Sequence, residues 1–492
     1  MNKSRILFTH SYFLRFDPKE FRAMMPYPPL GTLYAANYLR SLGYSVALHD
    51  TMLRQHEVEL NTSLQAQKPE IVVIYDDGFN YLTKMCLSRM REAAFTMTRL
   101  AKDFGSTIIV FSSDATDHAE DYIGHGADYV ICGEGELTLG ELVAHIVTKS
   151  PPSLAHAIHG IAFKEYGELV RTSNRKPLVN LDDLPFPAWD LIDLELYRNA
   201  WMKNHNYFSL NLVTTRGCPF HCNWCAKPIY GQVYHSRSPE NVVQEMKLLN
   251  VTIHPDHIWF ADDIFGLRPG WIREFDEIVN AQDALIPFKC LSRVDLLLQE
   301  DTVQHLKHSG CQTVWVGAES GSQKILDAME KGTTVQQIRD ATRLLRSAGI
   351  RIGFFLQFGY PGETREDIDK TIAMVKECMP DEIGISVSYP LPGTTFYDRV
   401  KSQLAKKQNW VVSQDLDLMF AGTFVPDFYR VLHRFVHKNF SIWRGQAEVR
   451  AMLRDPRTMR RQGLRHIAGM MYHSVTLPIA RRKLRILERI EA

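Results

Sequence analysis

The segment Thr215-Arg-Gly-Cys218-Pro-Phe-His-Cys222-Asn-Trp-Cys225 decides the fold of the second half of this chain. It overlaps and follows an apolar run at 212–215 that is typical of a buried strand. In parallel α/β barrels, the loops at the carboxyl ends of the strands carry the chemistry. Three cysteine thiolates at this spacing can wrap one metal centre. We therefore predict a metal site in the loop after the first strand of a parallel domain.

Five further strand candidates follow this segment. All are short apolar runs without polar alternation, as expected of parallel strands covered on both faces. The six predicted strands are 212–215, 258–261, 288–292, 313–317, 352–358 and 383–388. Ser238 and Pro239 predict the start of one intervening helix, and Thr334 and Gly349 the start and end of another. Six β/α units are too few to close an eight-stranded barrel of ~250 residues, so we expect a partial (β/α)6 barrel.

The cysteine spacing allows three interpretations. A 4Fe–4S cluster can be held by three cysteines, here Cys218, Cys222 and Cys225, with one iron left open. A structural zinc ion needs a fourth ligand, for which His221 is the candidate, although its position next to Cys222 gives awkward geometry. Ordinary core cysteines are the third interpretation, and the Gly-Cys-Pro turn at a strand end argues against it.

Five more segments recur at the ends of the predicted strands. They are Phe260-Ala-Asp-Asp263-Ile-Phe-Gly266, Arg293-Val-Asp295, Gly317-Ala-Glu-Ser-Gly321, Phe358-Gly-Tyr-Pro-Gly-Glu-Thr364 and Pro390-Leu-Pro-Gly-Thr394. With the cysteine loop, they resemble the radical S-adenosylmethionine (SAM) superfamily. The resemblance implies that the open iron of the cluster chelates SAM, which a one-electron reduction cleaves to methionine and a deoxyadenosyl radical. It also implies an electron donor such as flavodoxin or ferredoxin.

The same resemblance places cofactor-binding side chains after the later strands. Asp262 and Asp263 are predicted to accept hydrogen bonds from a substrate ammonium group. The alternative is that they cap a helix that begins near Pro269. Arg293 suits the SAM carboxylate, and the alternative is an ion pair with Asp295.

Four more residues complete this predicted set. Glu319 and Ser320, on the fourth strand, suit the ribose hydroxyls or the carboxylate of SAM. Gln357 and Gly359 end the fifth strand, where an edge poor in side chains lets adenine approach the backbone.

The first 150 residues contain a separate series of strands and helices. The predicted strands are 6–8, 46–48, 71–75, 107–111 and 129–132. The first helix carries Leu30, Leu33, Tyr34, Tyr38 and Leu42 and stops at Gly43. Five strands with intervening helices predict an open, doubly wound parallel sheet, which binds ligands at the carboxyl ends of its strands. The loops at those ends are 10–29, 50–52, 76–80, 112–116 and 133–136.

This first region also resembles a known domain. Pro28-Pro29-Leu30-Gly31 and Gly133-Glu-Gly-Glu136 are similar to segments of the cobalamin-binding domain in one branch of the radical SAM superfamily. That branch contains cobalamin-dependent methylases and an anaerobic oxidative cyclase of tetrapyrrole biosynthesis. The D-x-H-x-x-G pattern of a histidine-ligated cobalamin is absent, so any bound cobalamin should lack a histidine ligand from this domain. The alternative is a degenerate sheet that only shapes the active site.

The chain is thus divided into four predicted regions. They are a cobalamin-binding-like domain at 1–150, a hairpin and linker at 151–205, the radical SAM partial barrel at 206–400 and a basic helical region at 401–492. The hairpin is expected at 158–171, with its turn at Tyr166-Gly167. The resemblance to the superfamily covers roughly 5–400.

The C-terminal region concentrates positive charge. From Arg430 onward there are fifteen Lys and Arg against four Asp and Glu, although the net charge of the whole chain is only +1. The remaining acidic body argues against nucleic acid as a partner. The stretch 467–487 interleaves apolar and basic residues and can lie on an anionic membrane surface. Pro478 should interrupt it, and packing of this helix against the barrel is the alternative.

Composition bounds the class of protein. The sequence shows neither a signal segment nor an apolar run of the roughly 18–20 residues that a membrane span needs, so we expect a cytoplasmic globular enzyme with reduced thiols. The other cysteines, which are Cys86, Cys132, Cys290, Cys311 and Cys378, are expected in the core. The pair Cys86 and Cys132 lacks the spacing of a second cluster, which argues against a methylthiotransferase.

The predicted function is that of a cobalamin-dependent radical SAM enzyme that modifies an unactivated C–H position. Methylation of a small natural-product, lipid or tetrapyrrole substrate is the favoured reaction. The second candidate is an oxidative cyclase or rearrangement enzyme that transfers no methyl group. A non-catalytic corrinoid-binding module is the alternative of another class, and it does not explain the cluster loop.

Overall fold

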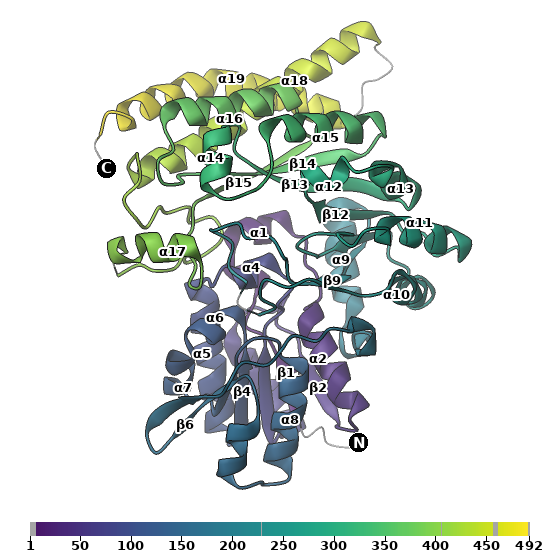
Figure 1. Ribbon diagram of the computed structural model, residues 1–492, viewed down its shortest axis with the longest axis vertical. Helices are drawn as coiled ribbons and strands as arrows, with labels where there is room; N and C mark the ends of the chain where they lie inside the picture. Colours follow the sequence, from purple (N-terminus) through teal and green to yellow (C-terminus); the bar gives the residue numbers. More distant parts are fainter. Residues whose placement is uncertain (1–5, 228, 405, 456–460, 491–492) are drawn as a thin grey trace. The chain divides into compact units, whose positions relative to one another are not determined.

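The N-terminal sheet has seven strands in the order β2-β1-β3-β4-β5-β6-β7 (Figure 1). The structure is a computed structural model that describes residues 6–227, 229–404, 406–455 and 461–490. The first five strands are parallel and comprise β1 (Ile6–Thr9), β2 (Val46–His49), β3 (Ile71–Tyr75), β4 (Thr107–Phe111) and β5 (Tyr129–Ile131). The chain runs from β1 outward to β2 and returns to β3, so the sheet is doubly wound. The predicted architecture is confirmed.

Helices cover both faces of this sheet (Figure 1). On one side α2 (Leu30–Ser41) packs against α8 (Glu136–Val147), and on the other α3 (Leu60–Gln67) packs against α5 (Ser88–Asp103). The shorter helices are η1 (Leu14–Phe16), α1 (Pro18–Ala23), η2 (Glu57–Glu59), α4 (Tyr81–Lys84), α6 (Ser113–Asp117), α7 (Ala119–Gly124) and η3 (Pro152–Ala157). Because Pro29 precedes α2, no capping side chain is available there. Asp77 replaces one, accepting from the N–H groups of Leu30 and Gly31 at 3.2 and 3.0 Å.

The predicted hairpin forms but extends the N-terminal sheet. β6 (Ile161–Glu165) pairs antiparallel with β5, and β7 (Glu168–Arg171) pairs antiparallel with β6. Pairing with β6 covers the edge that β5 would otherwise expose. The hairpin was predicted to belong to a linker, because its apolar pattern does not reveal which strand it joins.

The second sheet has six strands in the order β15-β14-β13-β12-β11-β8. They are β8 (Ser209–Leu212), β11 (His257–Phe260), β12 (Phe288–Ser292), β13 (Cys311–Glu319), β14 (Arg351–Phe358) and β15 (Glu382–Val387). The pairs β8–β11, β11–β12, β13–β14 and β14–β15 are parallel. Six parallel strands joined by helices confirm the predicted partial barrel.

The predicted first strand at 212–215 is divided in the structure. β8 ends at Leu212, and β9 (Thr215–Arg216) pairs antiparallel with β10 (His235–Ser236). The break occurs because the Asp262 carboxylate accepts from the N–H groups of Thr214 and Thr215, at 2.7 and 2.8 Å. These donors are therefore unavailable to a strand ladder.

The predicted helix starts are confirmed. Ser238 caps α10 (Pro239–Thr252), and Thr334 begins a capping box with Gln337 at the start of α15 (Val335–Ser347). The other helices before the C-terminal region are η4 (Leu181–Asp183), η5 (Trp189–Leu191), α9 (Leu194–His205), α11 (Trp271–Ala281), α12 (Val294–Leu297), α13 (Thr302–His308), α14 (Gln323–Ala328), α16 (Arg365–Cys378), α17 (Thr395–Val400) and η6 (Lys401–Gln403).

Two long helices form the C-terminal region. α18 (Pro426–Arg454) and α19 (Arg461–Leu487) lie side by side (Figure 1). Contrary to the prediction, α19 continues through Pro478, whose ring lies on an exposed side of the helix. No helix in the described ranges has both the length and the apolar character needed to cross a membrane.

The chain divides into two compact units. The first consists of Met1–Pro219, Ala226–Cys290 and Asn409–Asp415, and the second of Phe220–Cys225, Leu291–Gln408 and Leu416–Ala492. The first unit thus joins the N-terminal sheet to the first strands of the partial barrel. The boundaries predicted at 150, 205 and 400 follow sequence signals and remain predictions.

Candidate functional site

The three clustered cysteines lie in the loop that follows β9. Gly217 precedes Cys218 with a φ of +78°, and a Cβ at this position would be 2.2 Å from the carbonyl oxygen of Val233. Only glycine therefore fits the turn. Cys218, Cys222 and Cys225 are partly exposed, whereas the other five cysteines are buried as predicted. The loop thus presents three accessible thiols while the remaining thiols belong to the core.

The thiols fit a 4Fe–4S cluster better than a zinc ion. Within the described ranges, no three His, Cys, Asp or Glu side chains, these cysteines included, are placed to hold a metal ion, so the comparison rests on the number of thiols in the loop. His221, the predicted fourth zinc ligand, is exposed. In a 4Fe–4S cluster each cysteine binds a different iron, so three thiols leave the fourth iron without a protein ligand. This donor set is therefore suited to a cluster that binds SAM.

Asn223, which the sequence analysis missed, anchors the second half of the loop. Its side chain donates to the carbonyl of Ala328 at 2.8 Å and accepts from the Tyr360 hydroxyl at 2.9 Å. Its backbone N–H donates to the carbonyl of Met329 at 3.2 Å, and its carbonyl accepts from the N–H of Phe396 at 2.9 Å. Asn223 stands between two of the clustered cysteines, so these bonds fix the thiols on either side of it.

Arg293 lies beside this half of the loop. Its guanidinium stacks over the Phe220 ring at 3.6 Å and forms an ion pair with Asp295 at 3.1 Å. The alternative ion pair considered for Arg293 therefore exists, and it orients the side chain. A role in binding the SAM carboxylate stays a prediction.

Lys331 is a second cation at the loop and was not predicted. It forms an ion pair with Glu319 at 2.9 Å. Burial lowers the pKa of the Lys331 ammonium, but the charges of Glu319 and Cys222 raise it overall. A thiolate at Cys222 thus has a cation close to it. No sequence signal marks Lys331, because it follows α14 and not a strand. Its position at the loop becomes evident only in the fold.

Asp262 and Asp263 have different environments. Asp262 is buried and accepts four hydrogen bonds from the backbone and hydroxyl groups of Thr214 and Thr215. Asp263 is more exposed and pairs with Lys84 at 2.7 Å. Neither caps a helix, because Gly270 precedes α11. Asp262 therefore positions the start of the cluster loop, and ligand contacts by either residue stay predictions.

The remaining predicted residues lie at the carboxyl ends of two paired strands. Glu319 ends β13 opposite Leu356 of β14, and Ser320 lies within 3.1 Å of the Thr371 hydroxyl. Gln357 donates to Ser388 at 2.9 Å. A Cβ at Gly359 would be 3.2 Å from Leu418 and from Tyr429. The edge predicted to be open to adenine is thus covered by side chains at Gly359.

Glu363, in the segment after β14, is a buried acid. One carboxylate oxygen accepts from the N–H of Gly359 at 2.7 Å, and the other has no hydrogen-bond partner among the described atoms. Burial raises the pKa of Glu363 to about 8. The carboxyl group is therefore protonated at neutral pH.

This pKa predicts a pH-dependent stability. A glutamate in the unfolded chain has a pKa of ~4.3. Between that pH and about 8 the folded protein therefore holds a proton that the unfolded chain has lost, so the free energy of unfolding decreases as the pH rises through this window. We expect E363Q to remove this dependence. The wild type should lose up to about 1.4 kcal/mol per pH unit relative to E363Q between pH 6 and 8, and nothing further above it. Urea unfolding measured from pH 6 to 9 tests this, and parallel curves would contradict it.

An ion cluster inside the first unit holds the other half of the loop. Arg216, two residues before Cys218, binds both oxygens of Glu136 at 2.7 and 3.0 Å and also pairs with Glu134. All three ion-pairing side chains are almost fully buried. Burial raises the pKa of Glu134, although Arg216 lowers it. The glutamates belong to the Gly133-Glu-Gly-Glu136 loop, so this loop binds the chain next to the first thiol.

Packing on the sheet explains Gly135, one of the glycines from which a ligand-binding loop was predicted. A Cβ at Gly135 would be 2.4 Å from the Tyr75 hydroxyl and 3.0 Å from the Phe111 ring. The need for glycine at this position therefore comes from packing on the sheet. The sequence interpretation, in which the loop lets a backbone approach a nucleotide tail or corrin edge, stays a prediction.

A small pocket in the first unit adjoins this cluster. It lies between the carboxyl ends of the N-terminal strands and the cluster loop, and its lining includes Gly78, Lys84, Ser113, Gly217 and Asp263. The buried Ser113 hydroxyl has no hydrogen-bond partner among the described atoms. An unpartnered hydroxyl at this edge fits a ligand that supplies its own polar groups, as the side chains of cobalamin do.

The loops at the carboxyl ends of the N-terminal strands contain one histidine, His10, which contacts other protein groups. His10 is buried, and its ring lies 2.8 Å from Asp50 and 3.0 Å from the Thr51 hydroxyl. It is therefore held within the protein, and the absence of a histidine ligand to cobalamin from this domain stays a prediction.

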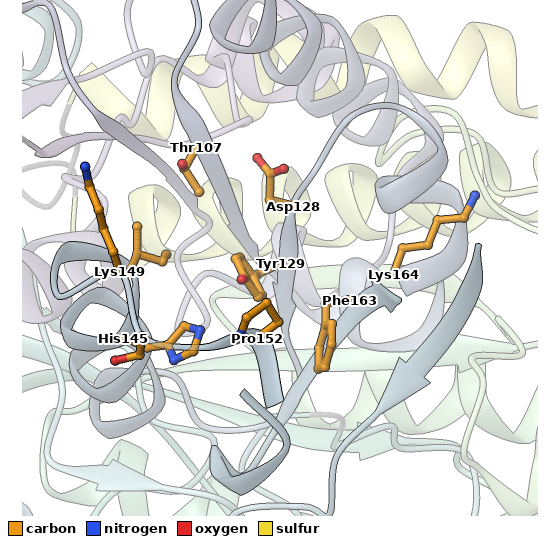
Figure 2. A pocket seen from close by; sticks show the side chains of 10 residues that line it. Thr107, Asp128, Tyr129, His145, Lys149, Pro152, Phe163 and Lys164 are labelled. Atoms are coloured by element: carbon orange, nitrogen blue, oxygen red, sulfur yellow. The ribbon is translucent and has the colours of Figure 1, made fainter. Parts of the chain in front are cut away.

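A larger hollow lies at the opposite end of the same sheet (Figure 2). Thr107 and Tyr129, which line it, are the first residues of β4 and β5. Open α/β sheets bind their ligands at the carboxyl ends of the strands. We therefore do not assign this hollow to the active site.

Comparison with known proteins defines the class to which this fold and loop belong. The model of the radical SAM superfamily matches residues 212–375. The "Uncharacterized methyltransferase PH0819" of Pyrococcus horikoshii is 30% identical over 395 residues, covering 78% of this chain and 81% of that protein. The chain belongs to the radical SAM superfamily. Its relatives include the anaerobic magnesium-protoporphyrin IX monomethyl ester cyclase of Rubrivivax gelatinosus, 26% identical over 78% of this chain and 69% of that protein.

A solved structure shares most of the fold. The cobalamin-dependent SAM radical enzyme OxsB, with aqua-cobalamin and SAM bound, matches with a TM-score of 0.68 at 17% identity. The match covers 97% of this chain and 72% of that chain. The predicted combination of a doubly wound sheet with a partial radical SAM barrel is thereby confirmed.

Proposed function

We propose that this protein is a cobalamin-dependent radical SAM enzyme that modifies an unactivated C–H position, with methylation as the favoured reaction. The observation that carries the proposal is the buried Arg216–Glu134–Glu136 cluster. It connects the loop of the three thiols to the edge of the doubly wound sheet where such folds bind ligands. One segment thereby links the two cofactor sites, which an isolated corrinoid-binding module would not require.

The residues around the loop have distinct parts in this proposal. Cys218, Cys222 and Cys225 hold the 4Fe–4S cluster, which supplies the electron that cleaves SAM when both are bound. Arg293 and Lys331 provide positive charge beside the second half of the loop. Such cations stabilise anionic thiolates and a carboxylate. An external flavodoxin or ferredoxin is the proposed electron donor.

The proposal that cobalamin binds has separate support. The structurally similar OxsB carries aqua-cobalamin, and this chain matches it over both the N-terminal sheet and the barrel. Here the pocket lined by Gly78 and Ser113 offers polar groups, the unpartnered Ser113 hydroxyl among them, at the carboxyl ends of the N-terminal strands. These groups can bind the polar periphery of a corrinoid, with no histidine ligand from this domain.

An oxidative cyclisation without methyl transfer is the second candidate. It is favoured by the similarity to the cyclase of Rubrivivax gelatinosus, which extends over most of this chain. The two reactions differ in where the methyl group of SAM goes.

Labelled SAM separates the two candidates. The anaerobically reconstituted protein, supplied with cobalamin, a reductant and a cell extract as substrate source, should transfer label from [methyl-14C]SAM to a small-molecule product. Heat-treated protein and extract alone are the controls. Release of deoxyadenosine with all label retained in methionine would overturn the methylase proposal and favour the cyclase. Cobalamin absorption by the repurified protein tests that cofactor independently.

A further inference from the structure

The helix α19 presents apolar side chains on two opposite sides. One side packs against α18: Leu484 is 1% exposed, and a Cβ at Gly445 of α18 would be 2.4 Å from Met470. This close approach requires glycine, and the salt bridge between His466 and Glu448 at 3.0 Å supports it. The packing of α19 on α18 uses mainly this side, and Lys438 of α18 also lies 5.7 Å from the Tyr472 ring at its margin.

The opposite side of α19 is apolar and faces solvent. We define the outer stripe as six residues whose exposed fractions lie between 55% and 77%: Leu464, Met471, Tyr472, Val475, Ile479 and Ile486. Met471 and Tyr472 are adjacent, and the other spacings of three, four or seven residues place all six along one face of the helix. An exposed apolar row of this length is typical of an interaction site rather than of a solvated surface.

Positive charge adjoins the outer stripe. The basic cluster consists of the exposed residues Arg481, Arg482, Lys483, Arg485 and Arg489. None of them forms an ion pair with a residue of the described ranges. The one acidic residue in the described part of this helix and its last turn is Glu488, which pairs with Arg365. Unpaired cations beside exposed apolar side chains match a surface that is both negative and apolar.

We propose that the outer stripe and basic cluster of α19 bind an anionic membrane surface, with the helix lying in the plane of the lipid headgroups. Apolar side chains would enter the boundary of the acyl chains, while arginine and lysine bind lipid phosphates. A dimer formed through α19 is less suitable, because a second copy of this helix does not offer the acidic side chains that would match the basic cluster. The proposal rests on α19 and not on the proposed reaction.

Vesicle flotation of the full-length holoprotein tests this surface. We expect the protein to float with vesicles of phosphatidylcholine and phosphatidylglycerol and to remain unbound with phosphatidylcholine alone. Raising the salt concentration should weaken the binding, because ions screen the phosphates. Equal flotation with neutral vesicles, or none with anionic ones, would overturn the proposal.

Two sets of variants distinguish the parts of the surface. R481Q/R482Q/K483Q should weaken binding to anionic vesicles by roughly a hundredfold. V475E/I479E should abolish it, whereas V251E, at an apolar residue of α10 that is 74% exposed, should leave it unchanged. Iron content and circular dichroism verify that each variant is folded. Unchanged flotation of R481Q/R482Q/K483Q and V475E/I479E would contradict the proposal. It would also be contradicted if the wild type were an oligomer that V475E/I479E dissociates while vesicle binding stays the same.

Discussion

Replacing any one of Cys218, Cys222 and Cys225 by alanine is expected to abolish the reductive cleavage of SAM. In the proposed cluster each thiol would bind its own iron, and no other cysteine of the described ranges is accessible to replace it. The rate of deoxyadenosine formation should fall by about 10³-fold or more, because no side chain can supply the chemistry of the cofactor. Iron, sulfide and deoxyadenosine are measured on anaerobically reconstituted protein.

A matched substitution separates the cluster from general effects of cysteine loss. Cys311 is 1% exposed in β13 and belongs to the core. C311A should keep about four iron atoms per chain and full SAM cleavage. Wild-type iron content and activity in C222A, or the loss of both in a folded C311A, would show that the ligands are assigned incorrectly.

The second large effect is expected at Arg216. R216L leaves Glu134 and Glu136 buried without their cation, which should destabilise the protein by about 3–5 kcal/mol. The damage should also reach the cluster, because Cys218 is two residues away. The free energy of unfolding in urea and the iron content are measured together, and both should decrease. A higher pH should increase the loss, since Glu134, whose pKa is raised by burial, then ionises without its cation.

Two further variants test whether the unpaired charge causes this effect. R216M combined with E134Q and E136Q removes all three charges and should recover much of the stability. R339L breaks an ion pair of similar length, 2.9 Å to Glu377, but on the surface. It should cost at most about 1 kcal/mol. If R216L behaved like R339L, Arg216 would not be a support of the cluster loop.

The two sheets could be predicted from sequence because their strands are short apolar runs between recognisable helix signals. The five parallel strands of the first sheet agree with the prediction to within one residue at each end. The starts of α10 and α15 were also predicted, since the capping residues lie next to the helices that they cap. These signals are local in the chain.

The errors arise where distant residues decide the structure. The first barrel strand ends early because of Asp262, which lies 47 and 48 residues from the threonines that it binds. The hairpin joins the sheet through β5, and no residue in the hairpin indicates that partner. α19 passes through Pro478 at an exposed position, and which side of the helix is exposed is decided by its packing on α18, which a sequence does not record.

The residues of the candidate site likewise divide into those with a local sequence signal and those that only the fold brings together. The three cysteines carry a distinctive spacing and were predicted as ligands from it. Arg216 and its glutamates are about eighty residues apart, and their ion pairs become evident only in the fold. Asn223 and Lys331 were likewise missed: the partners of Asn223 follow β13 and β14, and the partner of Lys331 is Glu319 at the end of β13.

The most direct test is whether SAM binds to an iron of the cluster. Electron–nuclear double resonance is to be recorded on the reduced protein with SAM that carries 15N in its amino group. We predict a hyperfine coupling from this nitrogen, because three cysteines leave one iron open to the amino and carboxylate groups. A cluster signal that lacks the coupling at saturating SAM would contradict this claim.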